Sequence, residues 1–269
     1  MAFARGSDKQ TFDGPLLNVR NLTIRFGGLI AVNDVSFSVR SGCVKAIIGP
    51  NGAGKTTIFN LISGIYKPAS GEIFLRNHRL DKMPMHMMAE LGLSRTFQNV
   101  QLFHNMSVLE NAMVGCHTRT RADLLLSILR TPGMRREERE SRECAMENLE
   151  KVGLAGFADL PAGSLPFGKQ RVLEIARALA SDPELLLLDE PAAGLNTTET
   201  GEVGDIITSL KEKGMTILLV EHDMSLVMNI SDEVVVVDYG KKIAEGTPTE
   251  VQNDAKVVSA YLGADLEAV

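Results

Sequence analysis

A glycine-rich segment, GPNGAGKTT at residues 49–57, constrains the fold more than any other part of this chain. It fits the pattern G-x-x-x-x-G-K-S/T, in which backbone N–H groups and a helix N-terminus surround phosphate oxygens. The segment Val44–Ile48 before it, apolar except for Lys45, is typical of a buried strand, and Thr56–Ser63 after it is typical of a helix. Because strand, loop and helix follow in the order that phosphate binding needs, the segment predicts a nucleotide-binding α/β domain.

The residue types of this segment each have a physical role. Its glycines allow a tight backbone path, because glycine tolerates positive φ angles and close backbone approach. Lys55 brings a positive charge to the β- and γ-phosphates, and the hydroxyl of Thr56 can ligate Mg²⁺. The predicted phosphate-binding residues are Gly49, Pro50, Asn51, Gly52, Ala53, Gly54, Lys55, Thr56 and Thr57.

Composition disfavours several classes of protein. The 269 residues carry a formal net charge of −6, whereas general nucleic-acid binders are normally basic. The three cysteines lie far apart with no C-x-x-C pair, which indicates neither a disulfide framework nor a zinc site. No apolar stretch reaches the roughly 18–20 residues that cross a bilayer. The polar segment 1–15 predicts a flexible tail rather than a secretory signal.

The remaining patterns predict an α/β fold with a mixed core sheet, an antiparallel N-terminal β-subdomain and an inserted α-helical subdomain. Leu16–Phe26 and Ala31–Val39 are expected strands that pair across the turn at Gly27–Gly28. The helical subdomain is expected at about 83–181, within one domain whose core covers 16–82 and 182–265. The other expected elements are helices at Gly168–Ser181 and Thr197–Lys213, a last helix that begins at Thr247 with a capping box to Glu250, and strands at Glu72–Leu75, Leu185–Leu188, Met215–Val220, Val234–Val237 and Lys242–Glu245. The last two of these strands are expected to form a hairpin.

A second chemical motif is LLLLDEP at residues 185–191. Its leucines predict a parallel strand covered on both faces, which brings Asp189 to the end of the sheet where ligands bind. Asp189 is expected to hold Mg²⁺ through water, and Glu190 is expected to polarise the water that attacks the phosphate. The alternative for Glu190 is a salt bridge at the strand end.

Two further polar residues are candidates for the same chemistry. His222 comes just after the expected strand Met215–Val220 and can reach a γ-phosphate, although a lone histidine is more often structural. Gln98, in SRTFQN, has a neutral side chain that can reach Mg²⁺ and the attacking water. Its own sequence context does not distinguish it from an ordinary polar residue.

Taken in order, GPNGAGKTT, TFQ, LPFGKQR, LLLLDEP, AAGLN and EHD resemble the motifs of an ABC-transporter ATPase subunit, over roughly residues 16–263. The resemblance implies ATP and Mg²⁺ as ligands. It also implies that Gln98 and His222 join Glu190 as catalytic residues, and that Thr56, Gln98 and Asp189 contact the metal. Phe26 matches the aromatic that stacks on adenine, with a strand core residue as the alternative.

The same resemblance assigns two more loops to nucleotide binding. A signature motif, which faces the nucleotide of a partner ATPase, is formed by Leu165, Pro166, Phe167, Gly168 and Lys169. The D-loop is formed by Gly194, Leu195 and Asn196, of which Asn196 is expected to contact nucleotide.

A closer resemblance is to the longer ATPase subunit of branched-chain amino-acid importers, carried by SRTFQNVQLF, SVLENAMVG, DEPAAGLN and EGTPTEV. It implies a second ABC ATPase as partner, in a heterodimer or, in isolation, a homodimer. It also implies two membrane-spanning permease subunits, an indirect link to a periplasmic or extracellular substrate-binding protein, and a peripheral place on the cytoplasmic face of the inner membrane. No nucleic-acid partner is expected.

Other functions share part of these patterns. ATPases of urea or amide import and of lipopolysaccharide export are similar to this chain in several motifs. Soluble ABC proteins of translation or DNA repair are disfavoured, because they carry two cassettes, coiled coils or zinc-binding insertions. A nucleotide-binding regulator without turnover is disfavoured by Glu190 and His222 and weakly favoured by Pro166.

The expected signature loop departs from the family pattern LSGGQ. Pro166 has neither a hydroxyl nor a backbone N–H, and Phe167 replaces a glycine, so potential phosphate donors are missing. A charge-assisted hydrogen bond is worth on the order of 1.5–3 kcal/mol, which the charge of Lys169 can offset only in part. These changes predict an asymmetric pair, in which the partner's nucleotide faces the weaker loop.

Overall fold

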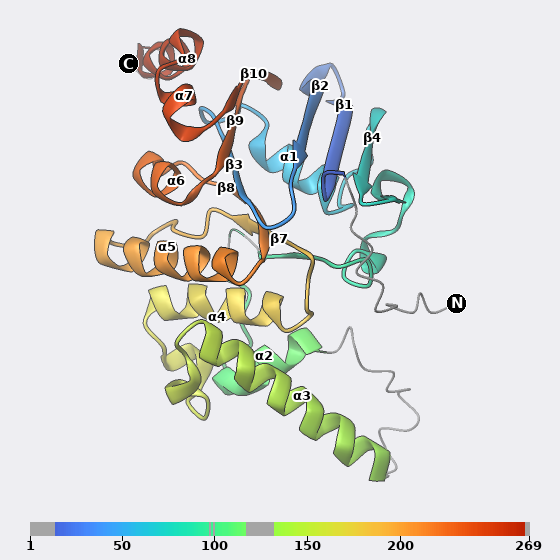
Figure 1. Cartoon of the computed structure of the whole chain (residues 1–269), viewed down its shortest axis with the longest axis vertical. Helices are drawn as coiled ribbons and strands as arrows, with labels where there is room; N and C mark the ends of the chain where they lie inside the picture. Colours follow the sequence, from blue (N-terminus) through green and yellow to red (C-terminus); the bar gives the residue numbers. More distant parts are fainter. Residues whose placement is uncertain (1–13, 97, 99, 117–131, 267–269) are drawn as a thin grey trace.

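Figure 1 shows the computed structural model of the chain, which combines an antiparallel sheet, a core sheet and a group of helices. The structure describes residues 14–96, 98, 100–116 and 132–266. Almost all of the predicted tail at 1–15, and residues 117–131 of the segment between Cys116 and Arg142, lie outside the described residues. Within the described ranges, every helix is too short or too polar to cross a membrane.

The core sheet is built of β3 (Val44–Ile48), β6 (Leu93–Arg95), β7 (Leu185–Asp189), β8 (Thr216–Val220), β9 (Glu233–Asp238) and β10 (Lys241–Gly246). The strand order is β10-β9-β3-β8-β7-β6. All neighbours are parallel except β9 and β10, which form the predicted antiparallel hairpin. Every residue of β3, β7 and β8 is buried, as expected for strands covered on both faces.

The antiparallel sheet is built of β1 (Leu17–Phe26), β2 (Leu29–Val39), β4 (Ser70–Leu75) and β5 (His78–Arg79). Its order is β2-β1-β4-β5. The β1–β2 pair runs from Leu17 opposite Val39 to Phe26 opposite Leu29, so the predicted hairpin is confirmed.

The helices are α1 (Lys55–Ile62), α2 (Val108–Cys116), α3 (Pro132–Lys151), α4 (Phe167–Leu179), α5 (Thr197–Glu212), α6 (Met224–Ile230), α7 (Pro248–Gln252) and α8 (Ala255–Leu266). In Figure 1, α2, α3 and α4 gather at one end of the molecule, away from β1, β2 and β4. All three helices lie within residues 83–181, where the sequence predicted a helical subdomain.

Two hydrophobic clusters cover the two faces of the core sheet. Successive strand residues point to opposite faces. Ile47 and Leu218 therefore pack with α1 and the antiparallel sheet, whereas Ala46 and Leu219 pack with the other helices. Because both faces are covered, polar groups that act on a ligand are left at the ends of the strands.

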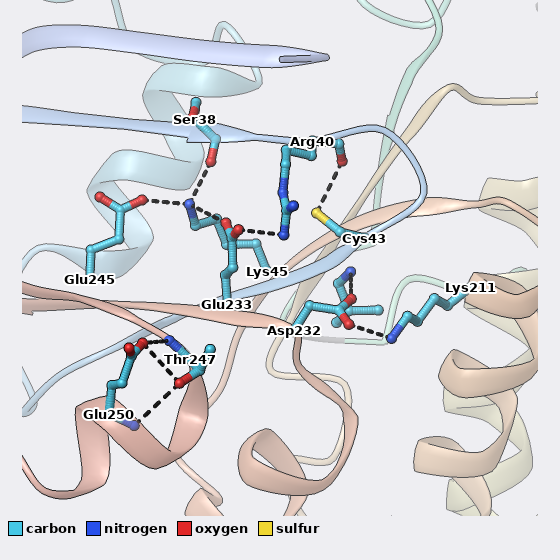
Figure 2. A network of polar contacts seen from close by, with 11 residues as sticks. Ser38, Arg40, Cys43, Lys45, Lys211, Asp232, Glu233, Glu245, Thr247 and Glu250 are labelled. Atoms are coloured by element: carbon cyan, nitrogen blue, oxygen red, sulfur yellow. Dashed lines mark hydrogen bonds and ion pairs between the residues drawn. The ribbon is translucent and has the colours of Figure 1, made fainter. Parts of the chain in front are cut away.

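Lys45 is a charged residue inside β3 that is only 1% exposed. Its ammonium donates to the backbone oxygen of Ser38 on β2 and to Glu245 on β10, each at 2.5 Å (Figure 2). It also lies 3.0 Å from Glu233 on β9. A buried charge is tolerated when it is paired and hydrogen-bonded. The cluster joins the strand before the P-loop to the antiparallel sheet and to the β9–β10 hairpin.

Two sequence expectations are wrong in detail. Leu93–Arg95, inside the region expected to be helical, pairs with β7 as the edge strand β6, a segment too short to show periodicity. The helix expected from Thr247 has the predicted capping box with Glu250 but ends at Gln252, and α8 follows it. We propose that the helical subdomain begins after β6; the division of the chain at the predicted bounds stays a prediction.

Candidate nucleotide-binding site

Four segments with polar side chains leave the core sheet at one edge. The strands β3, β8, β7 and β6 are adjacent and parallel. Their carboxyl ends lead into the P-loop at residues 49–57, into Glu221 and His222, into Asp189 and Glu190, and into the segment that carries Gln98. Open α/β sheets bind ligands at this edge, so the topology brings the candidate residues to the expected place.

The P-loop folds around the side chain of Lys55. The ammonium of Lys55 donates to the backbone oxygen of Gly49 at 2.7 Å and to that of Pro50 at 2.9 Å. Burial lowers the pKa of Lys55, and the charge of Glu190 opposes this shift. No side chain caps the N-terminus of α1, so no side-chain acceptor competes there with the anion that a helix N-terminus can bind.

Two glycines of the loop are required by close packing. A Cβ on Gly49, where φ is 154°, would lie 2.0 Å from the backbone oxygen of Val237. A Cβ on Gly54, where φ is 102°, would lie 2.6 Å from the backbone oxygen of Ala31. The loop is thus pressed against the ends of β9 and β2, which holds its backbone in one shape.

Asp189 is a buried carboxylate with two differently used oxygens. Its side chain is 2% exposed, and Oδ2 accepts a hydrogen bond of 2.6 Å from Arg95. Oδ1 is buried and has no hydrogen-bond partner among the described residues. Burial raises the pKa of Asp189, while the hydrogen bond and charge of Arg95 oppose the rise. An orphaned carboxylate oxygen beside a P-loop fits an aspartate that holds a metal-bound water.

Glu190 and Gln98 are in direct contact. The side-chain nitrogen of Gln98 donates to Oε2 of Glu190 at 2.9 Å. Glu190 has a φ of 49°, a left-handed backbone conformation that is unusual for a residue with a side chain. Its side chain is partly exposed, so water can reach the carboxylate.

His222 lies at the end of β8, next to the buried Glu221. The carboxylate of Glu221 accepts from the backbone N–H of Ala192 at 2.8 Å and from that of His222 at 2.9 Å. Glu221 thereby ties the loop after Glu190 to the loop that carries the histidine. The ring of His222 is 60% exposed and lies 3.7 Å from Glu221, without a hydrogen bond to Lys55 or Glu190.

The expected signature loop turns several of its groups onto its own chain. Leu165 is buried, and Pro166 precedes the first turn of α4 without a hydrogen-bonding side chain. Phe167 is exposed and lies under the guanidinium of Arg171, 5.3 Å from ring centroid to Arg171 Cζ. The ammonium of Lys169 lies 4.9 Å from the ring centroid of Phe157. Since this contact faces its own helical region, Lys169 is not extended towards solvent.

Gly168 and Asn196 are held close to Glu199. A Cβ on Gly168 would lie 2.9 Å from the carboxylate of Glu199, so α4 and α5 approach closely here. Asn196 caps α5, because its side chain accepts from the N–H of Glu199 while Glu199 accepts from the N–H of Asn196. The nucleotide contact expected of Asn196 stays a prediction.

Phe26 lies at the exposed end of the β1–β2 hairpin. Its ring makes an edge contact with Tyr66, with 5.2 Å between the ring centroids. Both rings are exposed, so the alternative of a strand core residue does not hold for Phe26. The hairpin lies beside the P-loop, since Ala31 is the residue that Gly54 approaches.

Comparison with known proteins decides the family. The family model described as ABC transporter matches residues 32–193, and the one described as branched-chain amino acid ATP-binding cassette transporter matches residues 241–267. The chain belongs to the ABC transporter family. Like other ABC ATPase domains, it binds nucleotide.

Relatives of this ABC ATPase cover almost its whole length. The high-affinity branched-chain amino acid transport ATP-binding protein LivG of Salmonella typhimurium is 48% identical over 93% of this chain and 98% of its own. The protein BraF of Pseudomonas aeruginosa, described by the same words, gives the same three values: 48%, 93% and 98%. The ADP conformation of MJ1267, an ATP-binding cassette of an ABC transporter, matches with a TM-score of 0.80 and 33% identity, over 93% of this chain and 99% of that one.

Sequence reasoning missed three residues that contact the candidate site residues or the loops that carry them. They are Arg95, which contacts Asp189, Glu221, which links two loops, and Tyr66, which pairs with Phe26. Only weak signals point to them: an arginine directly before TFQ, a glutamate directly before the candidate histidine, and an aromatic after the P-loop helix.

Proposed function

We propose that this ABC ATPase hydrolyses ATP to drive a branched-chain amino-acid importer. The observation that carries the proposal is the hydrogen bond between Gln98 and Glu190, at the edge of the sheet that also carries the P-loop. The importer assignment is supported by 48% identity to LivG and BraF, whose names describe branched-chain amino acid transport. In this proposal the ATPase subunit drives the conformational change of the transporter and does not contact the cargo.

The residues at this edge divide the work of hydrolysis between them. Lys55, which donates to the P-loop carbonyls of Gly49 and Pro50, can redirect its N–H groups to the β- and γ-phosphates of ATP. Glu190 orients a water and takes its proton, and Gln98 holds the carboxylate in position. Phe26 and Tyr66 offer aromatic faces to adenine, and His222 is assigned to the γ-phosphate.

The residues present fit a divalent cation. Asp189 offers the buried oxygen Oδ1, and the side chains of Thr56 and Gln98 are accessible at the same edge. When bound, Mg²⁺ supplies positive charge that neutralises the phosphate oxygens. We assign its ligands to Thr56, to Gln98 and, through water, to Asp189.

The proposed assembly contains a second ABC ATPase and two membrane-spanning permease subunits, with a substrate-binding protein as an indirect partner. In this proposed assembly the chain is a peripheral subunit on the cytoplasmic face of the membrane. The exposed Phe103, close to Gln98 in the chain, supports contact with the permeases in this region. The altered loop at Pro166 and Phe167 supports a heterodimer in which the two nucleotide sites differ.

Uptake of labelled leucine, isoleucine and valine tests the proposal. Cells that lack this chain are complemented with the wild type, with Glu190→Gln or with Glu184→Gln, a control carboxylate paired with Arg76 at the other end of β7. We expect the wild type and Glu184→Gln to restore uptake and Glu190→Gln to fail. Uptake that does not depend on the chain would exclude this cargo and leave urea, amides or lipopolysaccharide to be tested.

A further inference from the structure

Arg95 connects three parts of the molecule through one guanidinium group. Its Nη2 donates to Oδ2 of Asp189 at 2.6 Å. Its Nη1 donates to Oδ1 of Asn60 at 2.8 Å and to Oγ of Ser63 at 2.7 Å, both on the P-loop helix α1 or at its end. The side chain is 8% exposed, so these bonds form largely away from water.

The backbone of Arg95 is held as firmly as its side chain. Arg95 lies opposite Leu187 in the β6–β7 pair, and the next residue, Thr96, donates its N–H to the backbone oxygen of Leu187 at 3.0 Å. The guanidinium carbon also lies 5.6 Å from the ring centroid of Phe59 on α1. A side chain fixed at both ends can set the orientation of the group that it binds.

Arg95 donates to only one of the two carboxylate oxygens of Asp189. Arginine and a carboxylate commonly form two parallel hydrogen bonds. Here Arg95 uses one oxygen of Asp189 and directs its other terminal nitrogen to α1. The second oxygen, Oδ1, is left buried without a hydrogen-bond partner among the described residues.

We propose that Arg95 is a positioning residue that turns Oδ1 of Asp189 towards the metal site. It fixes the carboxylate through Oδ2, and its own guanidinium is held by the hydrogen bonds to Asn60 and Ser63 at α1, the helix that begins with Lys55. It also couples Asp189 to the strand that leads to Gln98. The inference rests on the proposed metal role of Asp189.

Nucleotide binding with and without metal tests the inference. The full chain is titrated with fluorescently labelled ADP in excess Mg²⁺ and again in EDTA. The ratio of the affinity in Mg²⁺ to the affinity in EDTA measures the contribution of the metal. Arg95→Met removes the guanidinium, Arg95→Lys keeps the charge but not the two-ended fork, and Arg40→Met is a control at an exposed arginine that pairs with Glu233. Asp189→Asn reports the metal contribution of Asp189 itself.

We expect both Arg95 variants to lower the ratio about tenfold, because groups that orient a metal ligand typically contribute 10–100-fold to metal affinity. Affinity in EDTA should stay within about twofold of wild type, and Arg40→Met should behave as wild type. A wild-type ratio in both Arg95 variants would overturn the inference if Asp189→Asn lowers the ratio. A wild-type ratio in Asp189→Asn would overturn the proposed metal role, and this inference with it.

A second variant guards against loss of folding. Asn60→Ala combined with Ser63→Ala removes both side-chain hydrogen-bond acceptors at α1 and leaves Arg95, its charge and its contact with Phe59 in place. Thermal unfolding in EDTA reports whether each variant folds. We expect the double variant to lower the ratio about threefold, less than the Arg95 changes. An unchanged ratio in a folded double variant would overturn the role of α1 as the anchor.

Discussion

The P-loop edge and the signature loop use their polar groups in opposite ways. At the P-loop edge, Lys55 donates to the backbone oxygens of Gly49 and Pro50 and Gln98 donates to Glu190, so the proposed catalytic side chains are held together at one edge of the sheet. In the loop at residues 165–169, the cation of Lys169 lies on Phe157, and Phe167 lies under Arg171. The first region brings its polar groups together at the end of the core strands, whereas the second turns its cation and its ring onto neighbouring side chains of its own helical region.

This difference supports the proposed asymmetric pair. A partner that brings serine and glycine to the P-loop of this chain would complete one strong site. The partner's own nucleotide would face Pro166, which offers no N–H. Four changes break or sharpen the comparison.

The largest expected effect comes from Glu190→Gln. The change removes the proposed base but keeps the side chain's size, so ATP hydrolysis by the assembled complex should fall by at least about 100-fold. Phosphate release at saturating ATP measures it. The matching change in the partner ATPase should cost less, and equal losses would contradict the asymmetry.

Lys55→Met tests whether the P-loop edge is prepared for phosphate. Loss of charge-assisted hydrogen bonds, on the order of 1.5–3 kcal/mol, should weaken ATP binding by about 10–100-fold. Titration of the isolated chain with labelled ATP measures the change. Lys67→Met, at an exposed loop lysine, is the control, and a similar small effect of both would show that Lys55 does not bind phosphate.

Replacing Pro166 by Ser and Phe167 by Gly sharpens the comparison from the other side. The double change restores a hydroxyl, an N–H and a flexible glycine, and should raise turnover at the partner's site by about tenfold. The measurement uses a complex in which this chain also carries Glu190→Gln, so that only the partner's site remains active. Unaltered turnover would mean that the native loop is already adequate.

Lys169→Gln should have the smallest effect. The cation–π contact with Phe157 predicts a loss of about 0.5–1 kcal/mol in the free energy of unfolding, measured by denaturant titration. A stability loss without a large loss of turnover would indicate that Lys169 stabilises its own helical region and does not act on the partner's nucleotide. A fall in turnover of more than tenfold would show that Lys169 reaches the partner's nucleotide.

Much of the site follows from local patterns. The P-loop and the leucine run before Asp189 carry their residue types at fixed spacing, because strand, turn and helix chemistry acts over a few residues. The strand β6 could not be predicted, since three residues at a sheet edge show no period. The helix from Thr247 was predicted at its cap but not at its end, because the start has a local signal and the end does not.

The sequence by itself determined the family, the order of the elements and the residue types available for nucleotide chemistry. The tertiary structure alone decided which of these groups meet: Arg95 contacts Asp189 across 94 positions of sequence, and Gln98 contacts Glu190 across 92. It also decided that Lys169 lies on Phe157. The physical reason is that backbone propensity is local, whereas the direction of a long side chain depends on charges and rings that only the packed sheet and helices bring within reach.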